Sequence, residues 1–113
     1  MQMLYSRNWS KSILDKYSVK IYPTAISDLD VIYRYIAFQK LYSETAKKQI
    51  NRIKKAILNL AVFPYSYPEI NQGRFACKGY RNLLIDNYMV IYTVDEAERI
   101  VYIVSVQFKH RNI

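Results

Sequence analysis

The chain has 113 residues, about half of them apolar, and only two of them are glycine. This composition suits one domain with a substantial core and excludes a disordered chain. Seventeen Lys and Arg stand against nine Asp and Glu, which gives a formal net charge of +8. A field of this sign attracts RNA, DNA, an anionic membrane or an acidic protein, and charge alone does not choose among them.

Cys77 is the single cysteine and His110 the single histidine. One cysteine forms no internal disulfide, and one cysteine with one histidine does not assemble a zinc site. We therefore expect a cytoplasmic protein with no metal and no other cofactor. No apolar run approaches a signal-peptide core or the roughly 18 residues of a membrane span, so we expect no membrane partner.

The first predicted strand covers residues 17–22. Val19 and Ile21 alternate toward one side of it, and Pro23 ends the run. A helix is predicted next, from a cap at Thr24 to about Gln39. Its apolar residues recur at steps of three and four, which places them on one stripe: Leu29, Ile32, Tyr33 and Ile36.

A second helix is predicted from Ser43, a candidate N-cap with Glu44 in the first turn, to a stop before Pro64. It has the clearest periodicity in the chain, with these apolar positions: Ala46, Ile50, Ile53, Ile57 and Leu60. The opposite side is basic and carries Lys47, Lys48, Arg52, Lys54 and Lys55. The two helices should form an antiparallel hairpin.

Residues 63–73 have no period and contain two of the three prolines, which indicates a surface loop. Three strands are predicted after it, at about 75–85, 88–94 and 100–107. The last two are almost continuously apolar, so we expect them to lie centrally with both faces at least partly covered.

The order strand, helix, helix, strand, strand, strand predicts an α+β domain. We expect a helical hairpin packed on one face of a small, mainly antiparallel sheet. Residues 17–113 would form this single domain, preceded by an N-terminal extension at 1–16. Two helices cover only one face, so the other face would expose apolar area unless another chain lies on it.

Two stretches carry a family resemblance. AISDLDVIYRYIA at 25–37 resembles the first helix of the RelE/ParE toxin superfamily, and KGYRNLLIDNYMVIYTVDEAERIVYIVSVQFKHR at 78–111 resembles its strand region with a basic tip. The resemblance spans roughly residues 17–111 and keeps the order of the elements. It rests on joint spacing and order, because no single motif in it is specific.

The resemblance implies a toxin of a type II toxin-antitoxin pair, neutralised by an antitoxin that wraps around it. RelE-like members cut messenger RNA in the ribosome, whereas ParE members inhibit DNA gyrase, and a shared fold does not decide between them. Our first hypothesis is ribosome-dependent messenger cleavage. The alternatives are gyrase inhibition without nuclease activity, or a non-catalytic relative that only binds its antitoxin. Operator DNA would be a partner only through the antitoxin complex.

Metal-independent RNA cleavage needs a base for the 2′-hydroxyl, cations for the phosphorane-like charge and an acid for the leaving oxygen. The resemblance implies Arg111 and Arg81 as the cations, His110 as the acid and Glu69 as the base. Three of these have a plain alternative: Arg111 and His110 as solvated groups near a terminus, and Glu69 as an exposed loop residue.

Basic residues around the K-G-Y stretch, Lys78 first among them, are candidates for phosphate contact. The full set of predicted nucleic-acid contacts is Lys78, Lys109, Arg74, Lys54 and Lys55. On the helix, such charges are more often a solvated face. Tyr65 and Tyr67, in the loop, are the freer candidates for stacking on bases. Packing explains the strand tyrosines better, namely Tyr88, Tyr92 and Tyr102.

Met89 departs from the nuclease pattern. RelE-like nucleases commonly carry an Arg directly after the residue that opens this strand, and this chain reads YMVIY instead. Loss of one charge-stabilising donor of this kind typically costs about two to three orders of magnitude in rate. Met89 therefore weakens the nuclease hypothesis and favours the ParE-like alternative.

Overall fold

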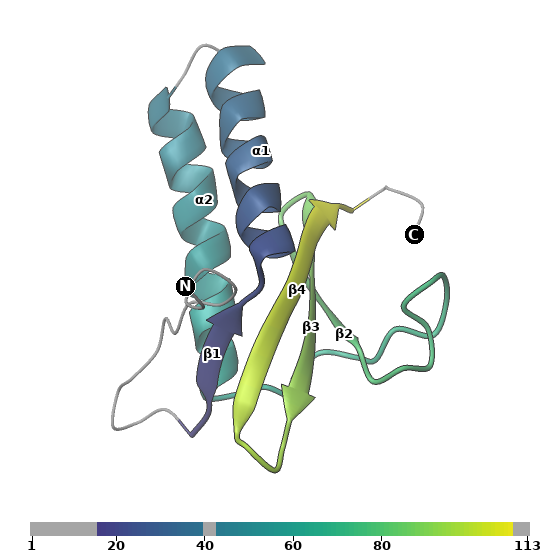
Figure 1. Ribbon diagram of the computed structural model, residues 1–113. Helices are drawn as coiled ribbons and strands as arrows, with labels where there is room; N and C mark the ends of the chain where they lie inside the picture. Colours follow the sequence, from purple (N-terminus) through teal and green to yellow (C-terminus); the bar gives the residue numbers. More distant parts are fainter. Residues whose placement is uncertain (1–15, 40–42, 110–113) are drawn as a thin grey trace.

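The computed structural model describes residues 16–39 and 43–109, which form two helices, a short 3₁₀ helix and four strands (Figure 1). The elements, in chain order, are β1 (Ser18–Ile21), α1 (Pro23–Gln39), α2 (Ser43–Leu58), η2 (Asn59–Ala61), β2 (Arg81–Ile85), β3 (Tyr88–Asp95) and β4 (Ile100–Phe108). This is the predicted order, and the predicted α+β class is confirmed.

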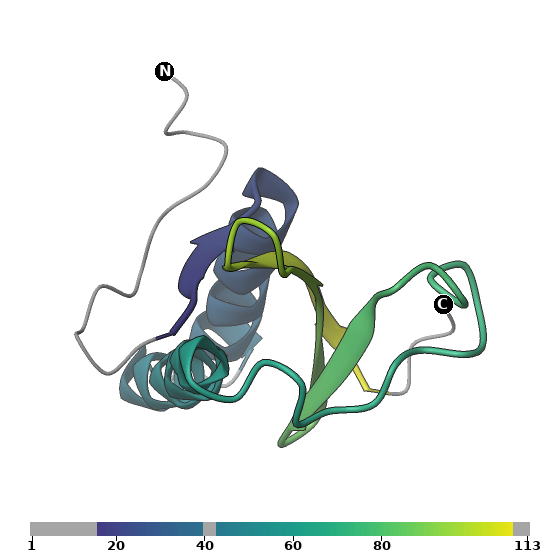
Figure 2. The same ribbon diagram turned by 90° about the horizontal axis from the view of Figure 1, so that it is seen from below.

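The sheet has the strand order β1-β4-β3-β2. β1 pairs with β4 in parallel, and the other two pairs are antiparallel. The two most apolar strands, β3 and β4, lie in the centre as predicted. Figure 2 shows both helices on one side of the sheet, while the chain between η2 and β2 runs past β2 toward the opposite side.

The helices bury the stripes that their periodicity predicts. On α1, Leu29, Ile32 and Ile36 are buried, and on α2 Ile53 and Ile57 are fully buried. They pack on the inward residues of the sheet, which are Val19, Ile21, Leu83, Tyr88, Val90, Tyr92, Val101, Ile103 and Val106. This single core holds the hairpin on one sheet face.

Two predicted boundaries were wrong. The strand placed at 75–85 begins only at Arg81, because Cys77 and Gly79 have left-handed φ angles of 58° and 84° that no strand accommodates. The first helix begins at Pro23, whose fixed φ suits a first helical position. Thr24 therefore lies inside the helix, and its hydroxyl donates to the carbonyl oxygen of Val104 at 2.7 Å.

The sheet face away from the helices, here called the far face, is defined by strand alternation and register. Met89 and Ile91 alternate with the inward residues of β3 and lie on it. Their cross-strand partners share this face: Asn82 and Leu84 on β2, and Ser105 and Gln107 on β4. Around Met89 the far face is thus mixed, with apolar side chains beside neutral polar ones.

Candidate functional site

The segment between η2 and β2 is laid along the outer edge of β2. The amide of Asn82 donates to the carbonyl oxygen of Pro68 at 3.1 Å, and the amide of Ile70 donates to that of Tyr80 at 2.8 Å. Glu69 and Arg81 form an isolated antiparallel bridge between these two bonds. The middle of the predicted loop is therefore fixed to the sheet through its backbone.

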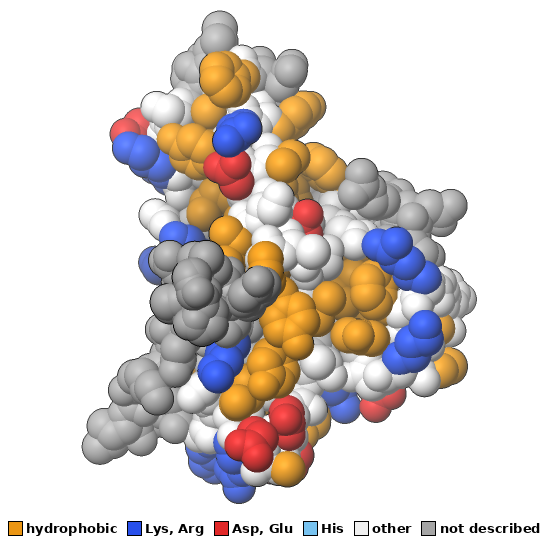
Figure 3. Space-filling view, viewed as in Figure 1, with side chains coloured by type: hydrophobic (Ala, Val, Ile, Leu, Met, Phe, Trp, Pro, Cys, Tyr) orange, Lys and Arg blue, Asp and Glu red, His pale blue; other side chains and the backbone are white. Residues whose placement is uncertain are grey.

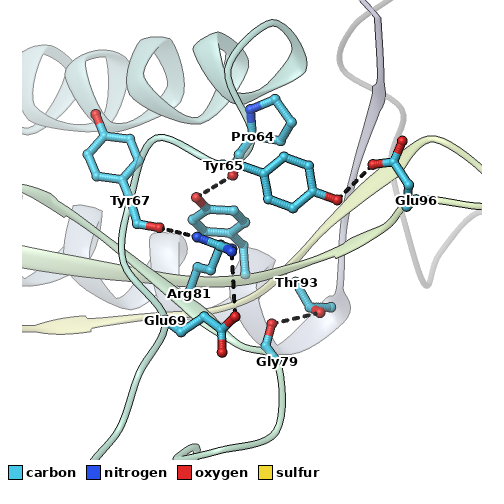
Figure 4. A network of polar contacts seen from close by, with 9 residues as sticks. Pro64, Tyr65, Tyr67, Glu69, Gly79, Arg81, Thr93 and Glu96 are labelled. Atoms are coloured by element: carbon cyan, nitrogen blue, oxygen red, sulfur yellow. Dashed lines mark hydrogen bonds and ion pairs between the residues drawn. The ribbon is translucent and has the colours of Figure 1, made fainter.

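Arg81 holds the same segment through its side chain (Figure 4). Its Nη1 donates to the carbonyl oxygen of Tyr67 at 2.6 Å, and its Nη2 lies 3.5 Å from Oε2 of Glu69. The guanidinium also lies 5.0 Å from the ring centroid of Tyr65, at cation–π distance. The side chain of Arg81 is only 19% exposed, so its guanidinium is engaged mainly by groups of the protein itself.

Tyr92 fixes the start of the segment from inside the core. Its hydroxyl is fully buried and donates to the carbonyl oxygen of Pro64 at 2.7 Å. Burial raises the pKa of this hydroxyl to about 12, so it stays protonated as a donor. The other end of the segment is held less tightly, by Thr93 Oγ1 donating to the carbonyl oxygen of Gly79 at 3.3 Å.

Glu96, in the β3–β4 turn, accepts hydrogen bonds from two tyrosines that lie far from it in the sequence. Its Oε1 accepts from the hydroxyls of Tyr65 at 2.7 Å and Tyr17 at 2.8 Å, and its Oε2 lies 3.3 Å from Nε of Arg99. The bond from Tyr65 is the main cause of the lowered pKa of Glu96. The same bond raises the pKa of Tyr65 to about 12. This cluster ties the loop to the chain just before β1.

These contacts change the interpretation of two predicted contact residues. Tyr65 and Tyr67 were expected to be free for bases, but the hydroxyl of Tyr65 is bonded to Glu96 and its ring lies under Arg81. Tyr67 packs against the core. Packing does account for Tyr88 and Tyr92, which are buried in the core.

Only one pair of the predicted catalytic residues is in contact in the described part of the chain. Glu69 and Arg81 form an ion pair, with Glu69 59% exposed. His110 and Arg111 lie outside the described residues. The structure therefore places one candidate base beside one candidate cation, and that cation is already engaged.

The predicted phosphate contacts do not form one cluster. Arg74 and Lys78 are exposed on the loop before β2, and Lys109 is exposed just after β4. Lys54 and Lys55 are exposed on α2, at the opposite side of the molecule from that loop in both views (Figures 1 and 2). The loop and the helix therefore present two separate basic surfaces.

Met89 lies on the far face near the start of β3 and is 6% exposed. Nδ2 of Asn82 lies 3.7 Å from its sulfur, and Gln107 lies directly opposite it on β4. A thioether thus stands where a RelE-like nuclease would carry a guanidinium. None of the six residues named above around Met89 is basic, while Lys20 of β1 lies on the same sheet face opposite Tyr102.

A second surface, which the sequence did not single out, lies on the outer side of α1. It consists of Val31, Tyr35 and Phe38, exposed by 59, 49 and 73%. We call it the outer α1 surface. Phe108 of β4 adjoins it, with its ring centroid 6.2 Å from that of Tyr35. Hydrophobic side chains are visible on α1 and along the sheet in Figure 3.

Asp28 of α1 accepts hydrogen bonds from β4 beside this surface. Its Oδ2 accepts from the backbone amide of Val106 and from the hydroxyl of Ser105, both at 2.9 Å. β1 pairs with β4 only as far as Ile103. Beyond that point the carboxylate of Asp28, instead of a strand, accepts a backbone amide of β4. No periodicity marks this role, although Asp28 lies in the stretch that resembles the toxin superfamily.

Two classes of site find no support in the described part of the chain. No group of three or more His, Cys, Asp and Glu side chains there is arranged to hold a metal ion. Among the helices at 23–39 and 43–61, none is both long and apolar enough to span a bilayer.

Comparison with known families decides the relationship. Residues 19–112 match the model of the ParE toxin of the type II toxin-antitoxin system ParDE. The chain belongs to this ParE toxin family. It is therefore a toxin of the RelE/ParE superfamily. A search of curated proteins found no match.

Solved structures with the same fold include two from toxin-antitoxin systems. One is the chromosomal ParDE system of P. aeruginosa, with a TM-score of 0.66 and 20% identity over 82% of this chain and 96% of that one. The other is the RelBE2 complex of Mycobacterium tuberculosis, with a TM-score of 0.59 and 19% identity over 82% of this chain and 98% of that one. At these identities they support the fold alone.

Proposed function

We propose that this ParE-family toxin arrests growth by binding DNA gyrase and does not cut RNA. The observation that carries the proposal is Met89, a buried thioether at the position where RelE-like nucleases commonly carry Arg. Phosphoryl-transfer chemistry without a metal depends on such cations. Another guanidinium of the predicted catalytic set, Arg81, is bonded to Tyr67 and paired with Glu69.

Messenger cleavage is the second candidate. One observation favours it: the carboxylate of Glu69 is exposed and lies beside Arg81, as a base next to a cation would. In that mechanism Glu69 would take the proton of the 2′-hydroxyl, and His110 and Arg111 would serve the leaving oxygen and the phosphate charge. Both candidate activities act in the cytoplasm, where we place the toxin.

The antitoxin is the expected neutralising partner, and we propose that it covers the outer α1 surface. A helix that is apolar on both its inner and its outer side is normally buried on both. On α1 the outer side is open, and its exposed charges Asp30 and Arg34 pair with each other at 3.0 Å. The chain carries a net charge of +8, so an antitoxin segment that is apolar on one side and acidic on the other fits best.

The test in cells is induction of the toxin without its antitoxin, with three parallel measurements: plasmid supercoiling, transcript 5′ ends and protein synthesis. We expect relaxed plasmids with intact transcripts in the first minutes. Early cleavage of translated messengers with normal supercoiling would support the second candidate. Normal growth would indicate a relative that only binds its antitoxin. Co-induction of the antitoxin is the control and should restore growth.

A further inference from the structure

The loop at residues 71–80, here called the basic loop, lies on the side of the molecule away from the two helices (Figures 1 and 2). Two of its exposed residues, Arg74 and Lys78, are cations, and the loop contains no Asp or Glu. The carboxylate that precedes it in the sequence, on Glu69, is already paired with Arg81. The basic loop is therefore a positive surface without a negative counterpart of its own.

Arg74 differs from the other described arginines because no carboxylate pairs with it. Within residues 16–39 and 43–109, every other arginine has a nitrogen within 3.5 Å of an acidic oxygen, in the pairs Arg34–Asp30, Arg52–Asp86, Arg81–Glu69 and Arg99–Glu96. A guanidinium stays charged throughout the physiological pH range, and its planar fork matches two oxygens of a phosphate. Arg74 thus presents an unneutralised cation to a partner from outside the chain.

A chain of contacts that ends at the sheet holds Arg74 in place. Its guanidinium lies 5.1 Å from the ring centroid of Phe75, and that ring packs edge-to-face on Tyr80 at 5.1 Å. The carbonyl oxygen of Tyr80 accepts from the amide of Ile70 at 2.8 Å, and the amide of Cys77 donates to the carbonyl oxygen of Ile70 at 3.1 Å. Because the loop is ordered before a partner arrives, binding costs less conformational entropy.

The turn before β2 adds backbone donors beside the side chain of Lys78. The φ angles of Cys77 and Gly79 are 58° and 84°, whereas that of Lys78 is negative. Successive amides with φ angles of alternating sign are typical of concave anion sites. The amides of Lys78 and Gly79 donate to no acceptor among the described residues. Apart from its chain neighbours, no described atom lies within 4 Å of where a Cβ of Gly79 would stand, so an anion can approach the backbone.

We propose that the basic loop binds the phosphate backbone of duplex DNA, namely the DNA that gyrase holds when the toxin binds it. Arg74, Lys78 and the two amides contact phosphate oxygens. This inference rests on the proposed function, since gyrase brings the toxin beside its DNA. The donors suit phosphates, and contacts of this kind position a protein without reading sequence. Single-stranded RNA fits less well, because its sites stack bases on free rings, whereas Phe75 and Tyr80 pack on each other.

The test uses full-length toxin that carries Arg74→Gln together with Lys78→Gln. The control carries Lys48→Gln together with Lys55→Gln, which removes the same charge from exposed positions of α2. Binding of the toxin alone to a short fluorescent DNA duplex is measured by anisotropy at several salt concentrations. The loop variant should bind about tenfold more weakly, and its slope of log affinity against log salt should be smaller by about two. The control should keep the wild-type slope.

Three further measurements use the same variants. The loop variant should need about ten times more toxin to half-inhibit gyrase supercoiling, in line with its weaker DNA binding. Its melting temperature and its affinity for the antitoxin should equal those of the wild type. Arg74→Gln and Lys78→Gln alone should each lower the salt slope by about one, so a folding defect of the double variant would not hide the result.

Equal duplex binding and equal salt slope of loop variant and wild type would overturn the inference. Equal losses in the loop variant and the control would also overturn it, because net charge alone would then attract the DNA. Weaker antitoxin binding with unchanged duplex binding would assign the loop to an acidic protein instead, and a larger loss for single-stranded RNA than for the duplex would assign it to RNA. Duplex binding needs no gyrase, so failure of the wild-type toxin to inhibit gyrase rejects the proposed function separately.

Discussion

Nη1 of Arg81 donates to the backbone carbonyl oxygen of Tyr67 over 2.6 Å, across 14 positions of sequence. This bond makes Arg81 part of the framework that holds the loop before β2. The family resemblance had suggested a catalytic cation at this residue. A framework role and a catalytic role give different results when Arg81 is replaced.

Replacing Arg81 by Met should therefore cost stability. The charge-assisted bond to Tyr67 and the contact with Tyr65 are lost, and we expect the free energy of unfolding to fall by about 1.5–3 kcal/mol. Urea denaturation measures this. Arg74→Met, at an exposed loop position, is the control and should be nearly neutral. Full stability of Arg81→Met with complete loss of toxicity would instead indicate a catalytic role.

Tyr92→Phe tests the buried bond to Pro64. The substitution removes one oxygen and leaves the Pro64 carbonyl without its donor, so we expect a loss of about 1–2 kcal/mol in the free energy of unfolding. Tyr33→Phe is the matched control, because this half-buried ring also packs against the core and its hydroxyl has no hydrogen-bond partner within residues 16–39 and 43–109. Equal stability of the two variants would contradict the account of how the loop is fixed.

The ion pair between Arg52 and Asp86 predicts an acid-sensitive contribution to stability. Arg52 bonds both carboxylate oxygens of Asp86 at 2.8 Å. These bonds, with that from Gln49, lower the pKa of Asp86 from 3.8 to about 2. A lowered pKa in the folded state stabilises above pH 4, and the effect is lost as the pH falls from 4 toward 2.

Asp86→Asn should therefore lower the urea midpoint at pH 7 and have progressively less effect between pH 4 and 2. Asp30→Asn serves as a control, since its pair with Arg34 is a solvated contact within one helix. A difference between wild type and Asp86→Asn that is the same at pH 7 and pH 2 would show that the charge of Asp86 is not responsible.

The outer α1 surface predicts where antitoxin binding is lost. Phe38→Glu and Val31→Glu place a carboxylate on an apolar surface that is exposed in the free toxin, so the free toxin should stay folded. Affinity for the antitoxin, measured by calorimetric titration, should fall about a hundredfold or more, as for a central interface residue. Lys55→Glu, on the solvent side of α2, reverses a charge without touching this surface. An equal loss of affinity in Lys55→Glu would contradict the assignment.

Much of the fold could be predicted because it follows from local pattern. The three- and four-residue steps of Leu29, Ile32 and Ile36 predict which side of α1 is buried. The alternation of Val19 and Ile21 does the same for β1. The start of β2 could not be read in this way, because Cys77 is not a residue type expected at a positive φ.

The candidate site was less predictable because its contacts join residues far apart in sequence. Tyr17 and Glu96 are 79 positions apart, and no spacing rule relates them. Tyr65 was expected to be free only because it lies in a loop. Met89 is the exception, since its identity within a recognisable strand was enough to weaken the nuclease hypothesis before its burial was known.

The central claim is that this toxin acts by binding gyrase, and purified components test it most directly. Full-length toxin is titrated against gyrase in a supercoiling assay and, in parallel, against ribosomes carrying a defined messenger. We predict that supercoiling stops as the toxin approaches the concentration of gyrase, while the messenger stays intact. Cleavage of the messenger with unaffected supercoiling would contradict the claim.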